Sequence, residues 1–268
     1  MTAPFLDENR APSTDASETG RLGEAIAQLL PALEQFNRFE GLDQGARRRD
    51  NWRAALDLEL PEHGRGLDEV LRELTEVAIP HGLRNGAPGF TGWITTAPTT
   101  VGTAAALAAT VAGSQRWWVQ SFNFLEAVAL RWLATLLDLP ADWQGTFTAG
   151  GSSANLVALG AARQSAFERV GRDPARDGVP GTSARIYASS EVHHVVNRAA
   201  AVLGLGRRAV HPVAVDAAGR IDLEELRRVL TADRSAGILP VALVATAATG
   251  NTAAIDPLAP MPDLAEAV

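Results

Sequence analysis

Two residue types with distinctive chemistry are missing from the 268-residue chain. It has no cysteine, so disulfides, thiolate metal sites and cysteine nucleophiles are excluded within it, and thiols say nothing about its redox compartment. It also has no lysine, because all 24 basic residues are arginine. A mechanism that needs a lysine Schiff base or a lysine general base cannot be completed by these residues.

Long apolar runs are missing as well. No stretch of about 18 apolar residues occurs, and the first residues lack the basic and apolar regions of a secretory signal, so a cytoplasmic protein without a membrane partner is expected. A composition of 46% hydrophobic and 21% charged residues is typical of a globular protein with a sizeable core. The net charge of −7 argues against a nucleic-acid partner and favours small molecules.

The N-terminal third is predicted to be helical. Residues 1–20 are polar and expected to form a loose arm, followed by an N-terminal helical segment over residues 21–85. Apolar residues from Leu22 onward lie on one helical face, although Pro31 is expected to kink or divide that helix. The stretch LDEVLRELTEVA, residues 67–78, predicts a second amphipathic helix.

The rest of the chain, residues 86–268, predicts an α/β domain. A loop with a possible short strand at residues 92–96 comes first, and Trp117, Trp118 and Trp132 are expected in a core or interface. Helices are predicted at residues 101–113, 121–137, 191–206 and 222–230, and strands at residues 184–189, 208–215 and 240–249. The last strand is continuously apolar, which is typical of a strand buried in a parallel sheet. This alternation favours right-handed βαβ crossovers.

The stretch GTFTAGGSSANLVAL, residues 145–159, predicts a strand over residues 146–148, a glycine turn and a helix. A helix start leaves backbone N–H groups unpaired and carries the positive end of the helix dipole. Glycines at this start, followed by the Ser152 and Ser153 hydroxyls, suit a phosphate group. A tight turn with either serine as an ordinary N-cap is the equally weighted alternative.

The stretch YASSEVHHVVNRAA, residues 187–200, places His193 and His194 in the first turn of a predicted helix after a strand, where ligands bind in open α/β sheets. An imidazole there could stack on a planar cofactor, while an exposed or capping residue is the alternative. Metal binding by the pair is disfavoured, because adjacent residues on a helix point about 100° apart and no further ligand stands at a suitable spacing.

Taken in order, five stretches resemble the pyridoxal-phosphate-dependent group II decarboxylases, which include the aromatic amino acid and glutamate decarboxylases. The stretches are APGFTGWITTAPT, SFNFLEAVALRWLATLLDLP, GTFTAGGSSANLVAL, YASSEVHHVVNRAA and PVALVATAATGNTAAIDPL. The resemblance implies the large domain of the aspartate aminotransferase-like fold (fold type I), incomplete at its C-terminus and preceded by N-terminal helices. It also implies pyridoxal 5'-phosphate as cofactor, an L-amino acid substrate and a homodimer clasped by the N-terminal helices.

The resemblance assigns roles to five residues. Gly151 and Ser152 match the turn that binds the cofactor phosphate, His193 matches the histidine that stacks on the pyridine ring and assists proton handling, and Thr246 and Thr249 match the threonine-containing strand end near the cofactor. His194 stands where the family commonly has a small polar residue. No metal is implied.

The resemblance also implies that two catalytic groups of the family, the aspartate that pairs with the pyridinium nitrogen and the Schiff-base lysine, would fall beyond Val268. These residues alone are therefore expected to be inactive as a decarboxylase. The alternative is a non-catalytic remnant that binds phosphate or pairs with other chains. An aminotransferase or lyase of the same fold is disfavoured, because FTGWITTAPT and the EVHH stretch resemble the decarboxylase branch.

Overall fold

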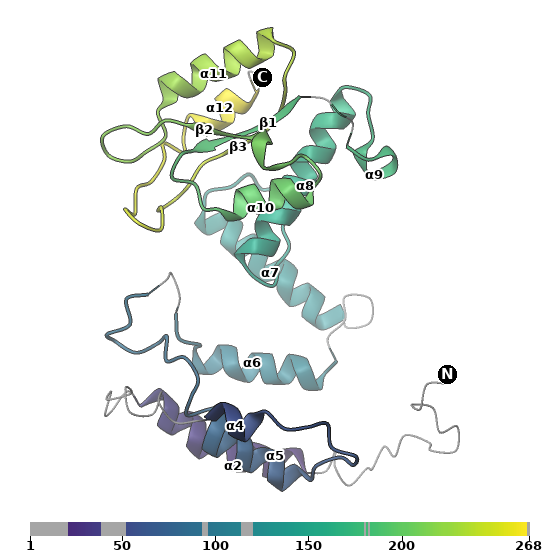
Figure 1. Cartoon of the computed structure of the whole chain (residues 1–268), viewed down its shortest axis with the longest axis vertical. Helices are drawn as coiled ribbons and strands as arrows, with labels where there is room; N and C mark the ends of the chain where they lie inside the picture. Colours follow the sequence, from purple (N-terminus) through teal and green to yellow (C-terminus); the bar gives the residue numbers. More distant parts are fainter. Residues whose placement is uncertain are drawn as a thin grey trace. The chain divides into compact units, whose positions relative to one another are not determined.

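The computed structural model describes residues 21–38, 52–92, 96–113, 120–179, 181 and 183–266. Its internal contacts divide the chain into two units, Met1–Ala108 and Ala109–Val268 (Figure 1). The predicted arm, Trp117 and Trp118 lie outside the described residues. The predicted domain division at residue 85 stays a prediction.

The first unit is helical, as predicted. It contains α2 (Leu22–Asn37), α4 (Trp52–Leu56) and α5 (Leu67–Glu73), which continues into the π-helical turn η1 (Leu74–Ala78). Pro31 was expected to kink or divide this helix; it does not divide it, because α2 is one helix with Pro31 inside it, and a kink stays a prediction. Pro31 is exposed, so water can solvate the carbonyl that its missing N–H leaves without a donor.

Two further helices lie close to the ranges predicted for them, residues 101–113 and 121–137. The small-residue helix α6 (Thr100–Val111) crosses the boundary between the units, and α7 (Gln120–Leu136) ends before Pro140. Trp132 on α7 is 69% exposed, so it is not a core residue in this structure. The other predicted position, in an interface, stays a prediction.

The second unit is built on a parallel sheet with the order β2-β1-β3, formed by β1 (Ala184–Ser189), β2 (Val210–Val213) and β3 (Leu239–Val244). Helix α10 (Val195–Val202) connects β1 to β2, and α11 (Leu223–Ser235) connects β2 to β3. The α/β prediction is confirmed, although β3 ends at Val244 rather than at residue 249. The remaining elements are α8 (Gly151–Arg169), α9 (Pro174–Asp177), the 3-10 turn η2 (Arg207–Ala209) and α12 (Met261–Glu266).

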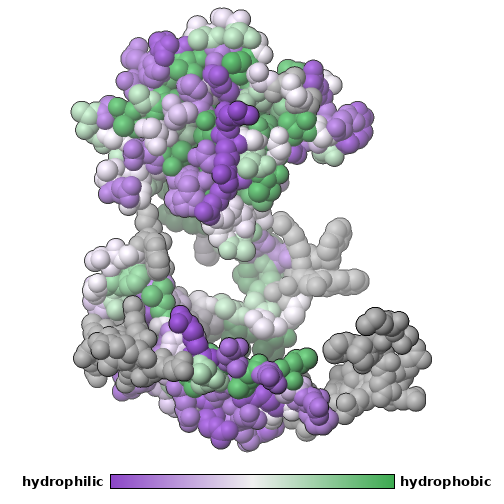
Figure 2. Space-filling model, in the orientation of Figure 1, coloured by the Kyte–Doolittle hydropathy of each residue, from purple (hydrophilic) through white to green (hydrophobic). Residues whose placement is uncertain are grey.

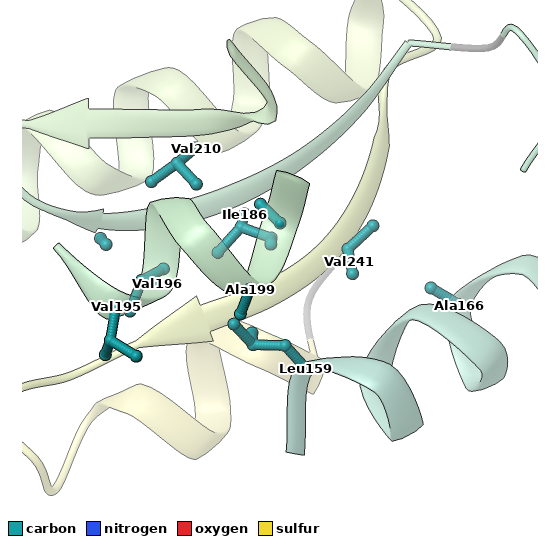
Figure 3. Close-up of a cluster of buried hydrophobic side chains, with 10 residues drawn as sticks. Leu159, Ala166, Ile186, Val195, Val196, Ala199, Val210 and Val241 are labelled. Atoms are coloured by element: carbon teal, nitrogen blue, oxygen red, sulfur yellow. The ribbon is translucent and has the colours of Figure 1, made fainter. Parts of the chain in front are cut away.

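Helices cover both faces of this sheet (Figure 1). On one face, α8 and α10 pack against apolar side chains of all three strands, including Ile186, Val210 and Val241 (Figure 3). On the other face, α11 and α12 pack around Tyr187 and Val213. The alternation of side chains along β1 produces this division, because neighbouring residues of a strand point to opposite faces.

The predicted strand at residues 146–148 was wrong, because these residues form no strand. Phe147 is 55% exposed, and its N–H donates to Glu126 Oε1 at 3.0 Å. A strand needs a neighbour for its backbone groups, and within the described residues no strand pairs with this segment. The β propensity of threonine and phenylalanine does not replace that neighbour.

A buried polar network joins β1 to α11. Arg185 donates from Nη1 to both carboxylate oxygens of Asp233, at 2.5 and 2.6 Å, and the Tyr187 hydroxyl donates to Asp233 Oδ2 at 2.8 Å. Asp233 is 6% exposed and Tyr187 is fully buried. Burial, and then the hydrogen bond to Asp233, raises the pKa of Tyr187 well above its usual range.

Stability should therefore fall at alkaline pH. A pKa raised in the folded state stabilises the fold fully below the unfolded pKa of about 10, and this stabilisation is lost as the pH rises further. Replacing Tyr187 with phenylalanine is expected to cost about 1–2 kcal/mol at pH 8 and to weaken the alkaline dependence. Urea unfolding between pH 8 and 11 measures both. Equal alkaline slopes for Tyr187→Phe and the unsubstituted chain would contradict the assignment.

Candidate functional site

A pocket of about 520 Å³ lies at the carboxyl ends of β1 and β3. This is where ligands bind in open α/β sheets, and the volume falls within the range of small-molecule sites. Segments far apart in the chain meet there: the start of α8, the β1–α10 connection with the first residues of α10, and the end of β3. Its lining residues are Gly151, Ser152, Asn155, Val192, His193, Val195, Val196, Val244, Ala245, Thr246 and Ala247.

The start of α8 is open toward the pocket. Gly150 has a φ of +137°, which favours glycine, and no atom lies within 4 Å of where a Cβ of Gly150 or Gly151 would be. Within the described part of the chain, no side chain caps the start of this 19-residue helix. The first-turn N–H groups of a helix have no intrahelical acceptor, so they remain available to an anion. Gly151 and Ser152 both line the pocket, and their role in binding phosphate stays a prediction.

His193 lines the pocket, whereas His194 is not among the lining residues. The expectation that both lie inside the helix was wrong, because α10 begins at Val195 and His194 is its N-cap. The Val195 N–H donates to His193 Nδ1 at 3.2 Å. With Nδ1 as the acceptor, the neutral His193 ring carries its proton on Nε2.

The two imidazoles lie side by side in a tilted arrangement. Their ring centroids are 4.1 Å apart at an interplanar angle of 34°. The nearby His193 ring, then burial, then Arg198 hold the pKa of His194 below its usual value.

The two predicted threonines have different surroundings. Thr246 lines the pocket directly after β3. Thr249 is 4% exposed and does not line the pocket; its Oγ1 lies 2.7 Å from Thr252 Oγ1 and accepts the Ala254 N–H at 3.1 Å. The Thr249 hydroxyl therefore stabilises its own loop, and a cofactor role for this residue stays a prediction.

Sequence reasoning missed one polar lining residue, Asn155. Its Nδ2 donates to the Gly151 carbonyl oxygen at 2.8 Å, which fixes the amide one turn into α8. Its position could have been predicted, because residues four apart share a helical face and Gly151 was already a predicted phosphate-binding residue.

Two other features are absent from the described ranges. These residues contain no group of three or more histidines and carboxylates that could hold a metal ion. Among the helices of the same ranges, none combines the length and the apolar character required to cross a membrane.

The fold is that of an α/β protein with a pocket at the carboxyl ends of its parallel strands. The model of the pyridoxal-dependent decarboxylase conserved domain matches residues 50–267, and the chain belongs to this family. It is 35% identical over 212 residues to an L-2,4-diaminobutyrate decarboxylase from Rhizobium meliloti, covering 78% of this chain and 41% of that protein. It is 33% identical over 140 residues to an aromatic-L-amino-acid decarboxylase from Bacillus atrophaeus, covering 52% and 27%.

Solved structures show the same fold. The glutamate decarboxylase domain of a Vibrio parahaemolyticus diaminobutyrate-pyruvate transaminase and L-2,4-diaminobutyrate decarboxylase matches with a TM-score of 0.80 and 25% identity, covering 96% of this chain and 57% of that one. Oryza sativa TDC with PLP matches with a TM-score of 0.71 at 22% identity, covering 100% and 57%. The predicted fold class is confirmed, and the chain spans 27% to 57% of the length of these relatives.

Proposed function

We propose that the pocket binds pyridoxal 5'-phosphate and that the chain is the phosphate-holding part of an amino acid decarboxylase. The observation that carries this proposal is the meeting of an uncapped helix start, a histidine and a strand-end threonine around one pocket in a member of this family. The relatives are decarboxylases of L-2,4-diaminobutyrate and aromatic L-amino acids, which supports an L-amino acid as substrate.

The residues present fit such a cofactor. The open approach to Gly151 and the first-turn N–H groups suit a phosphate, and the Ser152 hydroxyl adds a donor. His193 offers an imidazole to a planar ring, and its Nε2–H is available to hold or deliver a proton. When bound, the cofactor supplies an electron sink for the loss of carbon dioxide from an amino acid.

A second function has its own observation. The chain has no lysine, so these residues hold the cofactor without a covalent bond from a lysine side chain. This composition favours a non-catalytic chain that binds phosphate groups weakly and reversibly. The two functions share the pocket and differ in whether carbon dioxide is released.

Replacing Ser152 with alanine tests the phosphate position. The substitution removes one hydroxyl donor, worth about 1 kcal/mol, so the affinity for pyridoxal phosphate is expected to fall about fivefold. Equilibrium dialysis measures this fall, with inorganic phosphate as competitor. Ser153→Ala is the matched control, because Ser153 is adjacent in α8 but does not line the pocket. Equal affinities for the two variants would count against the proposed site.

We also propose that the chain forms a homodimer. Large apolar side chains of α7 are exposed, among them Phe124, Trp132 and Leu136 at 65%, 69% and 81%. Figure 2 shows apolar residues at the surface of both units. Exposed apolar surface of this kind is typical of an interface.

Light scattering after size exclusion tests the dimer. Twice the mass of one chain is expected, and Leu136→Glu is expected to shift the mass toward the monomer because it places a charge in the apolar surface. Val202→Glu is the control: Val202 is 73% exposed, comparable to Leu136, but lies on α10, outside α7 and the N-terminal helical segment. A stable monomer for the unsubstituted chain would contradict the proposal.

A further inference from the structure

The loop after β3 returns on itself beside the pocket. Ala247 and Ile255 form an antiparallel bridge, and the Asp256 N–H donates to the Thr246 carbonyl oxygen at 2.9 Å. Thr246 and Ala247, at the start of this loop, line the pocket. The position of the pocket wall therefore depends on how the loop is closed.

Asp256 closes the loop with its side chain as well. Its Oδ2 accepts the Thr246 N–H at 2.8 Å, and its Oδ1 accepts the Ile221 N–H at 2.7 Å. Asp256 and Ile221 are each 2% exposed. A carboxylate is buried at low cost only when it is well hydrogen-bonded, and bonds to an ionised acceptor are stronger than neutral ones.

The loop needs such an anchor. Ala248 has a φ of +73° and Ala253 a φ of +54°, a conformation that disfavours alanine and persists only where surrounding contacts enforce it. The backbone N–H and the side chain of Asp256 together bind both backbone groups of Thr246. The same side chain also accepts the N–H of Ile221, which directly precedes the N-cap of α11.

We propose that Asp256 is a positioning residue for the pocket. It acts through the backbone of Thr246 and fixes Thr246 and Ala247 against the start of α8. The identity of the ligand rests on the proposed function, whereas the role of Asp256 rests on its hydrogen bonds to the backbone. Removing the negative charge while keeping the shape should loosen the wall and weaken binding, without any direct contact between Asp256 and the ligand.

Asp256→Asn in the full chain tests the proposal. The amide retains one acceptor and presents an N–H₂ group to the other backbone N–H. We expect about tenfold weaker binding of pyridoxal phosphate by equilibrium dialysis and at least about tenfold faster hydrogen exchange of the Thr246 amide. The Val196 amide, which belongs to α10 and also lines the pocket, should exchange at an unchanged rate.

Asp233→Asn is the matched control. It is the same chemical change at another buried carboxylate of this unit, and Asp233 does not line the pocket. It is expected to lower the melting temperature while leaving the affinity for pyridoxal phosphate and the Thr246 exchange rate unchanged. An equal loss of affinity in both variants would mean general destabilisation and overturn the proposal.

Failure of the proposed function and failure of the role proposed for Asp256 give different results. If the unsubstituted chain binds neither pyridoxal phosphate nor inorganic phosphate, the proposed function fails, and the exchange of the Thr246 amide still decides the role of Asp256. If Asp256→Asn does not fold, the variant is made with Ala248→Gly, which adopts the positive φ without strain, and compared with Ala248→Gly alone. Unchanged Thr246 exchange in either comparison overturns the proposal.

Discussion

Replacing Asp233 with alanine is expected to destabilise the second unit by about 3–5 kcal/mol. The substitution removes the partner of both the Arg185 guanidinium and the Tyr187 hydroxyl. Tyr187 is fully buried, so its hydroxyl loses its acceptor in a place that water does not reach. The truncation also leaves a cavity against β1.

Urea unfolding followed by circular dichroism measures this loss. Glu224→Ala is the matched control on the same helix, because Glu224 pairs with Arg227 at 2.7 Å with its side chain 88% exposed. Exposed pairs contribute little, so the control is expected to change stability by less than about 1 kcal/mol. Similar losses in the two variants would show that the network with Arg185 and Tyr187 does not stabilise the sheet.

The 268-residue chain is expected to release no carbon dioxide from amino acids when supplied with pyridoxal phosphate. The reason is chemical, since no lysine side chain is present to bind the cofactor covalently. The cofactor should also be removable by dialysis, because only phosphate contacts, stacking and hydroxyl groups hold it.

Carbon dioxide release from L-2,4-diaminobutyrate and from L-tryptophan measures the activity. Buffer with pyridoxal phosphate but without protein is the control, because free amino acids react slowly with the aldehyde. Borohydride reduction followed by peptide mass spectrometry should find no pyridoxyl group on any side chain. Saturable turnover that is lost in His193→Ala would refute the expectation and require a catalytic amine other than lysine.

Local patterns predicted much of the second unit. The strand at residues 184–189 and the start of α11 were predicted from short-range patterns, and in the structure the Asp222 side chain caps α11 by accepting the N–H groups of Glu224 and Glu225. The strand predicted at residues 146–148 failed because pairing is a property of neighbours rather than of the segment. The start of α10 was predicted a few residues too early. The Val195 N–H donates to the His193 side chain, and the helix begins at Val195.

The site was predicted only in part, because some of its contacts join residues that are far apart in the sequence. Gly151, Ser152, His193 and Thr246 were found from turn chemistry and resemblance, and all line one pocket. Asp256 was missed because its partners are the backbone N–H groups of Thr246 and Ile221, and a bond to a distant backbone leaves no pattern in the sequence.

The most direct test of the proposed site is a titration of the ¹⁵N-labelled chain with pyridoxal phosphate, followed by amide chemical shifts. The largest shifts are expected at Gly151 and Ser152, with smaller ones at His193 and Thr246, because in the proposed site the start of α8 would hold the phosphate, whereas His193 and Thr246 would meet the rest of the cofactor. Inorganic phosphate should reproduce the shifts at Gly151 and Ser152 but not those at His193. Shifts centred elsewhere, or none at Gly151 and Ser152 at saturating ligand, would contradict the proposed site.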